Sequence, residues 1–242
     1  MNLKITLFNL LLFIGLNVGH AQTLTVKMLV DSVNSAWPVI DTLSMHATNN
    51  VLILSPNISL VNKELLDLQK PTSTPIGAVV YHTGGIIVDN GWIRIFGSGS
   101  DKFKRTLQTW NANKNKGKAF KLIADDAIGG HFALNYGEFG SDTGSVYYFS
   151  PKTLKNKSLN MDYGQFLKFC FQGNLDKFYT GMRWKTWRAD VANLNTDSSF
   201  LFLPFLWNGN ARNLDASVRK IIPAEQKYML TQQEIRKIGS IK

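Results

Sequence analysis

Apolar residues recur at helical spacing from residue 26 to residue 70, which predicts a helical first zone. The first amphipathic stretch contains Leu29, Val30, Val33, Ala36 and Trp37. Pro38 then marks a kink or the start of a new helix. Ser55-Pro56 precedes a second helical pattern, in which Asn57 is a possible N-cap and which Pro71 ends.

Short β-type runs separated by glycine pairs fill residues 76–150 and predict a compact antiparallel sheet. The predicted strands are Ala78–Tyr81, Gly85–Val88, Trp92–Phe96, Phe120–Ala124, His131–Asn135 and Ser145–Phe149. Asp89-Asn90-Gly91 lies between two apolar runs, and Asn-Gly tolerates the positive φ angles of a tight hairpin. The turn should therefore pair Ile86–Val88 with Trp92–Ile95.

Residues 151–242 have a mixed pattern. A helix is predicted from Asp162 to about Gln172, and a short one near Ala189–Leu194. Phe200–Trp207 is an apolar run broken by Pro204, which predicts an edge strand or a crossing segment. Pro223 suits the first turn of a last helix, over 223–239. The prediction is a single α+β domain over 22–242, a mostly antiparallel sheet flanked by N-terminal and C-terminal helices.

The first residues have the pattern of a secretory signal peptide over 1–21. Lys4 supplies a positive charge, Ile5–Val18 is largely apolar, and Gly19-His20-Ala21 offers small residues for cleavage after Ala21. An uncleaved N-terminal anchor is the alternative. The apolar run is short for a bilayer, which needs about 20 apolar residues. No later segment is apolar enough to cross, so we expect a periplasmic or secreted protein.

Charge and cysteine content narrow the choice of partners. The formal net charge is +10, and Cys170 is the only cysteine, so no intramolecular disulfide can form. Basic clusters occur at residues 102–105, 114–118, 152–157 and 219–220. In an exported protein these clusters favour an anionic envelope component, such as a lipid phosphate or an acidic glycan, over nucleic acid. Solvated loops that confer solubility are the alternative interpretation.

Acidic residues gather around one predicted turn. Asp125 and Asp126 precede Gly129-Gly130, and His131, Glu138 and Asp142 follow closely. Adjacent carboxylates suit a general acid/base pair or a hard-cation site. Alternatively, one of them caps the turn backbone. The histidines match no metal-ligand spacing, and the chain has no recognisable nucleophile motif, so no metal or cofactor is predicted.

Arg94 is flanked by Trp92 and Phe96 on one face of a predicted strand. If it is buried it must be paired, and Asp125 or Asp126 on a neighbouring strand is the expected partner. Gly97 and Gly99 follow that strand and could present backbone N–H groups to an anion. Tyr147 and Tyr148 point to opposite sheet faces, so at most one is buried inward.

Four sequence strings carry a family resemblance. They are AWP at 36–38, GGIIVDNGWIRIFGSG at 84–99, ADDAIGGHFALNYG at 124–137 and VYYFSP at 146–151. Together they resemble a bacterial family known only as a domain of unknown function, numbered twenty-six twenty-five, from Asp31 to about Trp207. More remotely, the order of elements is similar to the SUKH superfamily. That likeness implies an α+β protein-interaction module, in many members an immunity protein, without catalytic residues.

The sequence therefore predicts an exported, non-catalytic binding protein of unknown partner, either a protein or an anionic envelope component. Its expected binding surface is a rim formed by 89–91, 97–101, 125–131 and 138–144. The candidate binding residues are Trp92, Arg94, Gly97, Gly99, Asp125, Asp126, His131, Glu138, Asp142 and Tyr148. The alternative is an envelope hydrolase that uses Asp125, Asp126 and His131 on a glycan or ester.

Overall fold

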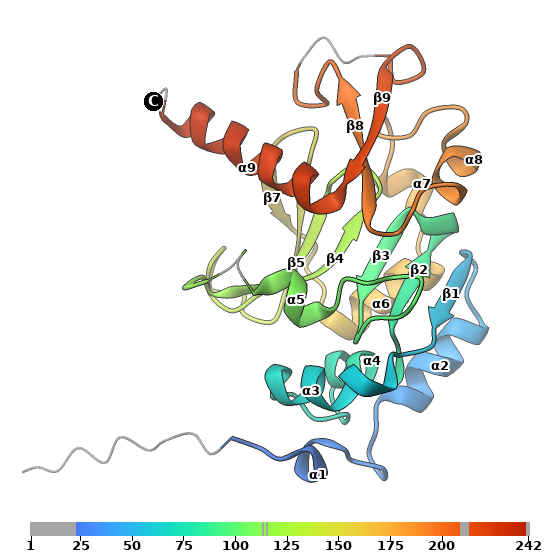
Figure 1. Ribbon diagram of the computed structural model, residues 1–242, viewed down its shortest axis with the longest axis vertical. Helices are drawn as coiled ribbons and strands as arrows, with labels where there is room; N and C mark the ends of the chain where they lie inside the picture. Colours follow the sequence, from blue (N-terminus) through green and yellow to red (C-terminus); the bar gives the residue numbers. More distant parts are fainter. Residues whose placement is uncertain (1–22, 113, 115, 209–212, 241–242) are drawn as a thin grey trace, which may run out of the picture.

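A seven-stranded antiparallel sheet forms the centre of the protein (Figure 1). The computed structural model describes residues 23–112, 114, 116–208 and 213–240, so the predicted signal peptide at 1–21 lies outside the described residues. The strands pair in chain order: β1 (Val51–Leu54), β2 (Gly85–Val88), β3 (Ile93–Phe96), β4 (Phe120–Asp126), β5 (His131–Asn135), β6 (Val146–Ser150) and β7 (Lys155–Ser158). The predicted α+β class with an antiparallel sheet is confirmed.

The predicted hairpin between β2 and β3 is present. Val88 pairs with Ile93, and the short 3-10 turn η1 (Asp89–Gly91) joins the strands. Asp89, Asn90 and Gly91 have φ angles of 53°, 61° and 100°. Asn and Gly tolerate this left-handed region, which explains why the turn forms here.

Helices cover both faces of the sheet. They are α1 (Val26–Leu29), α2 (Trp37–Met45), α3 (Ile58–Leu68), α4 (Pro75–His82), α5 (Leu107–Asn111), α6 (Tyr163–Gln172), α7 (Leu175–Phe178), α8 (Trp187–Ala192) and α9 (Ala224–Ser240). On β5, the Phe132 ring lies 4.9 Å from Phe166 of α6, and the His131 ring lies 5.0 Å from Tyr228 of α9. Successive side chains on a strand face opposite ways, so α6 and α9 lie on opposite faces.

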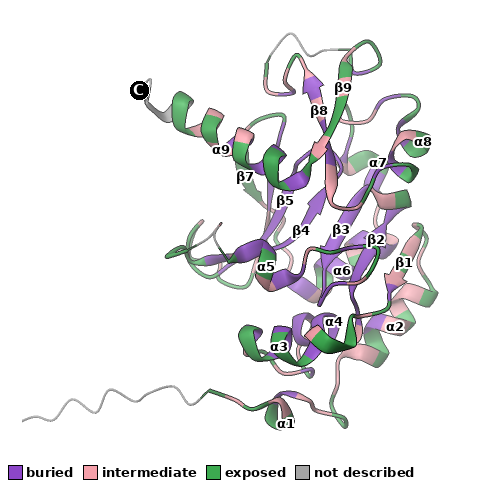
Figure 2. Ribbon diagram, in the orientation of Figure 1, coloured by how far each residue is buried: buried purple, intermediate pink, exposed green. Residues whose placement is uncertain are grey.

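A second, two-stranded sheet carries α9. Strands β8 (Ser198–Leu203) and β9 (Val218–Pro223) pair along their whole length, and α9 begins directly after β9. The hairpin joins the central sheet where Phe200 N–H donates to the Ala127 carbonyl at 2.7 Å. The central strands are largely buried, whereas much of α9 is exposed and extends away from the body (Figure 2).

Two predictions in the N-terminal half were wrong. Ala78–Tyr81 is not a strand but part of α4, because Thr74 caps the helix by accepting from Gly77 N–H and Pro75 occupies its first turn. Conversely, β1 lies inside the predicted helical zone. Both segments are short apolar runs, whose periodicity does not distinguish strand from helix.

The other expected elements are present; β2 and β5 have the predicted bounds, and the rest have shifted ends. Asn57 and Asp162 cap α3 and α6. The apolar run after residue 198 forms β8, which ends before Pro204. The sequence pattern missed α5, α7, β7 and β9. Strand β7 reads KNKS and is largely exposed at the sheet edge, where lysines discourage pairing with another chain.

Candidate functional site

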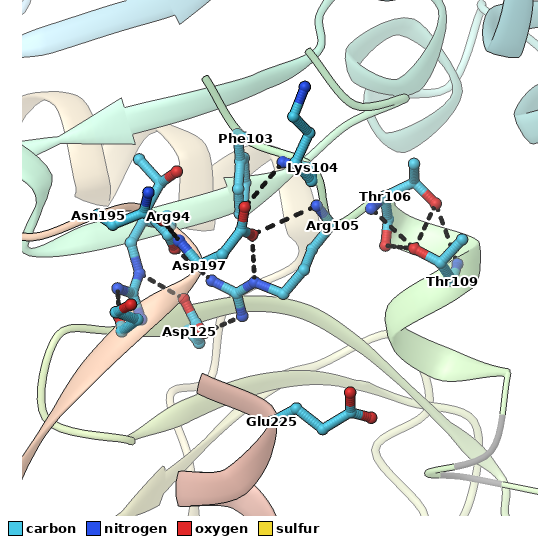
Figure 3. Close-up of polar contacts among 12 residues, drawn as sticks. Arg94, Phe103, Lys104, Arg105, Thr106, Thr109, Asp125, Asn195, Asp197 and Glu225 are labelled. Atoms are coloured by element: carbon cyan, nitrogen blue, oxygen red, sulfur yellow. Dashed lines mark hydrogen bonds and ion pairs between the residues drawn. The ribbon is translucent and has the colours of Figure 1, made fainter. Parts of the chain in front are cut away.

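A largely buried ion-pair cluster surrounds Asp125 at the end of β4, shown in Figure 3. Arg94 on β3 and Asp125 on β4 are register partners, and Arg94 Nε lies 2.7 Å from Asp125 Oδ1. Arg105 Nη1 approaches the other carboxylate oxygen at 2.5 Å. The predicted pairing of Arg94 with Asp125 is therefore confirmed. We call Arg94, Arg105, Asp125 and Asp197 the Asp125 cluster.

The two arginines of the Asp125 cluster also hold the β8–β9 hairpin. Arg94 donates to the Ser198 carbonyl at 2.6 Å, and Arg105 donates to the Thr196 carbonyl at 2.6 Å and to Asp197 at 2.9 Å. Burial alone would raise the pKa of Asp125, but the two guanidinium groups outweigh it and hold the pKa below its usual value. Asp125 is thus an ionised structural anchor.

Asp126 caps the turn that follows β4. Its Oδ1 accepts hydrogen bonds from Ile128 N–H at 3.1 Å and Gly130 N–H at 2.7 Å, and its Oδ2 accepts from the Tyr148 hydroxyl at 2.7 Å. Burial raises its pKa. A Cβ at Gly130 would lie 2.2 Å from Asp126 Oδ2, so only glycine fits. This is the backbone-capping alternative that the sequence left open.

His131 differs from both carboxylates. It pairs in register with Asp125 and is only 4% exposed, yet neither ring nitrogen has a hydrogen-bond partner among the described residues. Its ring lies beside Tyr228 and, at 6.0 Å, stacks with Phe149. Burial lowers the pKa of His131 to about 4, so the imidazole is neutral near pH 7.

Most of the predicted binding residues are buried, so they do not form the exposed rim that was expected. Trp92 packs against Tyr179, Trp184 and Trp187. The buried residues among the candidates are Trp92, Arg94, Gly97, Gly99, Asp125, Asp126, His131 and Tyr148. The reason is that the β8–β9 hairpin and the helices cover these strand ends, which local sequence patterns do not reveal.

The two glycines after β3 are closely packed rather than open to an anion. A Cβ at Gly97 would lie 2.4 Å from the Thr83 carbonyl oxygen, and one at Gly99 would lie 3.0 Å from Thr106. Only Glu138 and Asp142 of the predicted set reach solvent. Asp142 already accepts a hydrogen bond from the Tyr147 hydroxyl at 2.7 Å. A binding role for Glu138 and Asp142 stays a prediction.

A basic groove that the predicted rim did not include runs between α9 and the loop before β4. Its volume is about 460 Å³, and it is lined by Lys114, Lys116, Lys118, Glu225, Tyr228, Met229, Gln232, Gln233 and Arg236. Lys114 pairs with Glu225 at 3.0 Å, whereas Lys116, Lys118 and Arg236 form no ion pair with a described residue. The lysine cluster was visible in the sequence. Its position beside α9 was not, because more than a hundred residues separate them.

A smaller hollow adjoins the basic groove and contains His131. We call it the His131 pocket; its volume is about 230 Å³, and it shares Lys118, Tyr228 and Gln232 with the groove. Its other lining residues are Phe120, Leu122, His131, Ala133, Glu138, Phe139, Phe149, Leu154, Asn156 and Ile235. Neither Asp125 nor Asp126 lines either hollow.

In the part of the chain that the structure describes, no group of three or more histidine, cysteine, aspartate or glutamate side chains is placed to hold a metal ion. No helix among these residues has the length and apolar character needed to span a bilayer.

Comparison with known proteins identifies the family. YbfG of Escherichia coli K12, described as uncharacterized, is 40% identical over 209 residues, which cover 86% of this chain and 95% of YbfG. An uncharacterized protein of Haemophilus influenzae is 37% identical over 209 residues, 84% of this chain and 92% of that protein. No solved structure matches, and the likeness to the SUKH superfamily stays a prediction. The model of the family "Protein of unknown function DUF2625" matches residues 26–227, and the chain belongs to this family.

Proposed function

We propose that this protein is an exported, non-catalytic binding protein that holds an anionic lipid of the bacterial envelope in the basic groove. The observation that carries the proposal is the charge of that groove. Lys116, Lys118 and Arg236 line it without an ion-pair partner among the described residues, and its only acidic residue, Glu225, is already paired. Unpaired cations in a concave site attract and concentrate anions.

The ion pairs of Asp125 and the hydrogen bonds of Asp126 support a binding role over hydrolysis. A general acid or base must reach the substrate from a cavity. Asp125 is held by two arginines and Asp126 by two backbone N–H groups and a tyrosine. Both are almost fully buried and neither lines the described hollows, so the geometry gives the hydrolase alternative no support.

A lipid suits the groove better than an acidic glycan. Tyr228 and Met229 line the groove beside its cations, and the His131 pocket adds the apolar side chains Phe120 and Phe149. Apolar surface next to unpaired cations matches a molecule with a charged head and an apolar body. The N-terminal signal pattern supports the envelope as the place where such a ligand is met.

Vesicle flotation tests the binding proposal. The purified protein is expected to float with vesicles of phosphatidylglycerol and phosphatidylcholine but not with pure phosphatidylcholine, and to dissociate as salt is raised. Lys118→Glu and Arg236→Glu should each lower the bound fraction several-fold. Lys63→Glu makes the same charge change on α3, outside the groove, and should bind like the unmodified protein.

Two results would overturn the proposal. Equal loss of binding in Lys63→Glu would show that net charge, not the groove, drives association. Capture by a soluble acidic polysaccharide without any vesicle binding would replace the lipid with a glycan. Export is checked separately by fractionating cells that produce the full chain and sequencing the N-terminus, which should begin at Gln22.

A further inference from the structure

The His131 pocket extends the basic groove along one strand. Phe120, two residues after Lys118, pairs with Asn135 at the far end of β5, while His131 begins that strand. The four residue steps from His131 to Asn135 span roughly 13 Å at about 3.3 Å per residue. Lys118 and His131 therefore lie toward opposite ends of the same hollow.

Apolar side chains line the floor between these two ends, while Glu138, Asn156 and Gln232 add polar groups to the walls. Leu122 and Ala133 are register partners on the sheet face, and Phe149 pairs with His131 on the next strand. Ile235 of α9 closes the other side. At about 230 Å³ the pocket is smaller than the range of about 300–1,000 Å³ typical for whole drug-sized ligands, so it suits one chain of a larger molecule.

His131 is the polar exception at the inner end. A buried imidazole without a hydrogen-bond partner is unfavourable, and a ligand oxygen beside it would supply the missing bond. The ring is neutral near pH 7, because burial lowers its pKa to about 4, so it does not favour a second anion there. A neutral hydroxyl, which both donates and accepts, matches the imidazole.

We propose that the basic groove and the His131 pocket form one site for a single-chain anionic amphiphile, whose charged head lies at Lys118 and Arg236 and whose chain carries a neutral hydroxyl to His131. This inference rests on the proposed function and narrows its ligand. The chain lies against Leu122, Ala133 and Phe149. One such molecule occupies the site at a time, and the cations of the basic groove can also meet an anionic headgroup at a vesicle surface, which is what flotation measures.

Calorimetric titration of the purified full chain tests the site with three soluble probes. Ethyl phosphate presents the head alone, octyl phosphate adds the chain, and 8-hydroxyoctyl phosphate adds the hydroxyl. Octyl phosphate should bind at least about 100-fold more tightly than ethyl phosphate, since each buried methylene adds favourable transfer free energy. The hydroxyl should strengthen binding by about fivefold more, as a buried hydrogen bond does.

Two variants locate the chain and the hydroxyl. Ala133→Leu fills the middle of the pocket and should weaken octyl phosphate about tenfold while leaving ethyl phosphate unchanged. His131→Phe should abolish the advantage of the hydroxylated probe and keep the binding of octyl phosphate. Since the probe series is also compared on the unmodified protein, the test does not depend on either variant folding.

The outcomes distinguish a failure of this inference from a failure of the proposed function. Equal affinity for ethyl and octyl phosphate overturns the chain site, and groove-dependent flotation with vesicles would then still support surface binding. An equal advantage of the hydroxyl in His131→Phe overturns the role of His131. Failure of both phosphate binding and vesicle binding overturns the two proposals together.

Discussion

Asp125 and His131 face each other across β4 and β5, yet their surroundings differ sharply. Each oxygen of Asp125 meets an arginine, and those arginines continue to the β8–β9 hairpin. His131 is also buried but lines a hollow together with Leu122, Ala133 and Phe149, and it lacks any hydrogen-bond partner among the described residues. One polar group is fully satisfied, and its neighbour is not.

The contrast separates a structural role from a binding role. Buried polar groups that serve only the fold are almost always hydrogen-bonded, because leaving one unpaired costs about 1–3 kcal/mol. The Asp125 cluster follows this rule. His131 breaks it beside a cavity, which is where an unsatisfied group can be compensated by a ligand. Predictions at these two residues should therefore have opposite signs.

The largest effect is expected from Asp125→Ala. The substitution leaves Arg94 buried without its carboxylate and loosens the hairpin, so the free energy of unfolding should fall by about 3–5 kcal/mol. Urea denaturation measures it. Asp101→Ala removes an exposed carboxylate near Lys104 and should cost less than about 0.5 kcal/mol. A similar small cost for Asp125→Ala would mean that the cluster adds little to the fold.

His131→Phe should behave in the opposite way. Near pH 7 the variant should be as stable as the unmodified protein or more so, because it removes two unpartnered nitrogens from the interior while keeping a ring against Tyr228 and Phe149. A loss of more than about 1 kcal/mol in urea denaturation would contradict the assignment of His131 as an unsatisfied group.

The same residue predicts a pH dependence. The folded pKa of His131, about 4, lies below its ordinary value of 6.5, so the unfolded chain binds the proton more readily and stability falls as pH drops through that window. Burial is the main cause; Asp125 opposes the shift, while Lys227, Arg105 and Arg94 reinforce it. Relative to His131→Phe, the unmodified protein should lose about 2–3 kcal/mol between pH 7 and pH 4.5. A constant difference would contradict this prediction.

The pairing of Arg94 with an aspartate could be predicted from the sequence. Strand alternation and the Asn-Gly turn place Arg94 on a sheet face, and a buried arginine requires a carboxylate, so Asp125 or Asp126 followed as its partner. The pairing with Arg105 and Asp197 was not foreseen. It depends on the β8–β9 hairpin, which brings residues almost a hundred positions away against the sheet.

The surroundings of His131 could not be predicted, for the same physical reason. His131 looked like part of an acidic rim, because the sequence does not show that α9 crosses this face of the sheet. The last helix itself was predicted from its apolar spacing and Pro223. Its docking against β5 is set by long-range packing. The same packing forms the basic groove and the His131 pocket.

Glu225→Gln should change stability only slightly, and it tests the role of the basic groove. Glu225 is mostly exposed and pairs with Lys114, and such pairs are worth about 0–1 kcal/mol. The ammonium of Lys114 lies over the Trp110 ring. Without the carboxylate of Glu225, this ammonium is free to pair with an anionic ligand. The variant should therefore bind octyl phosphate severalfold more tightly, measured by calorimetry. Asp67→Asn frees Lys63 on α3 in the same way and should leave affinity unchanged, whereas weaker binding by Glu225→Gln would place the anion elsewhere.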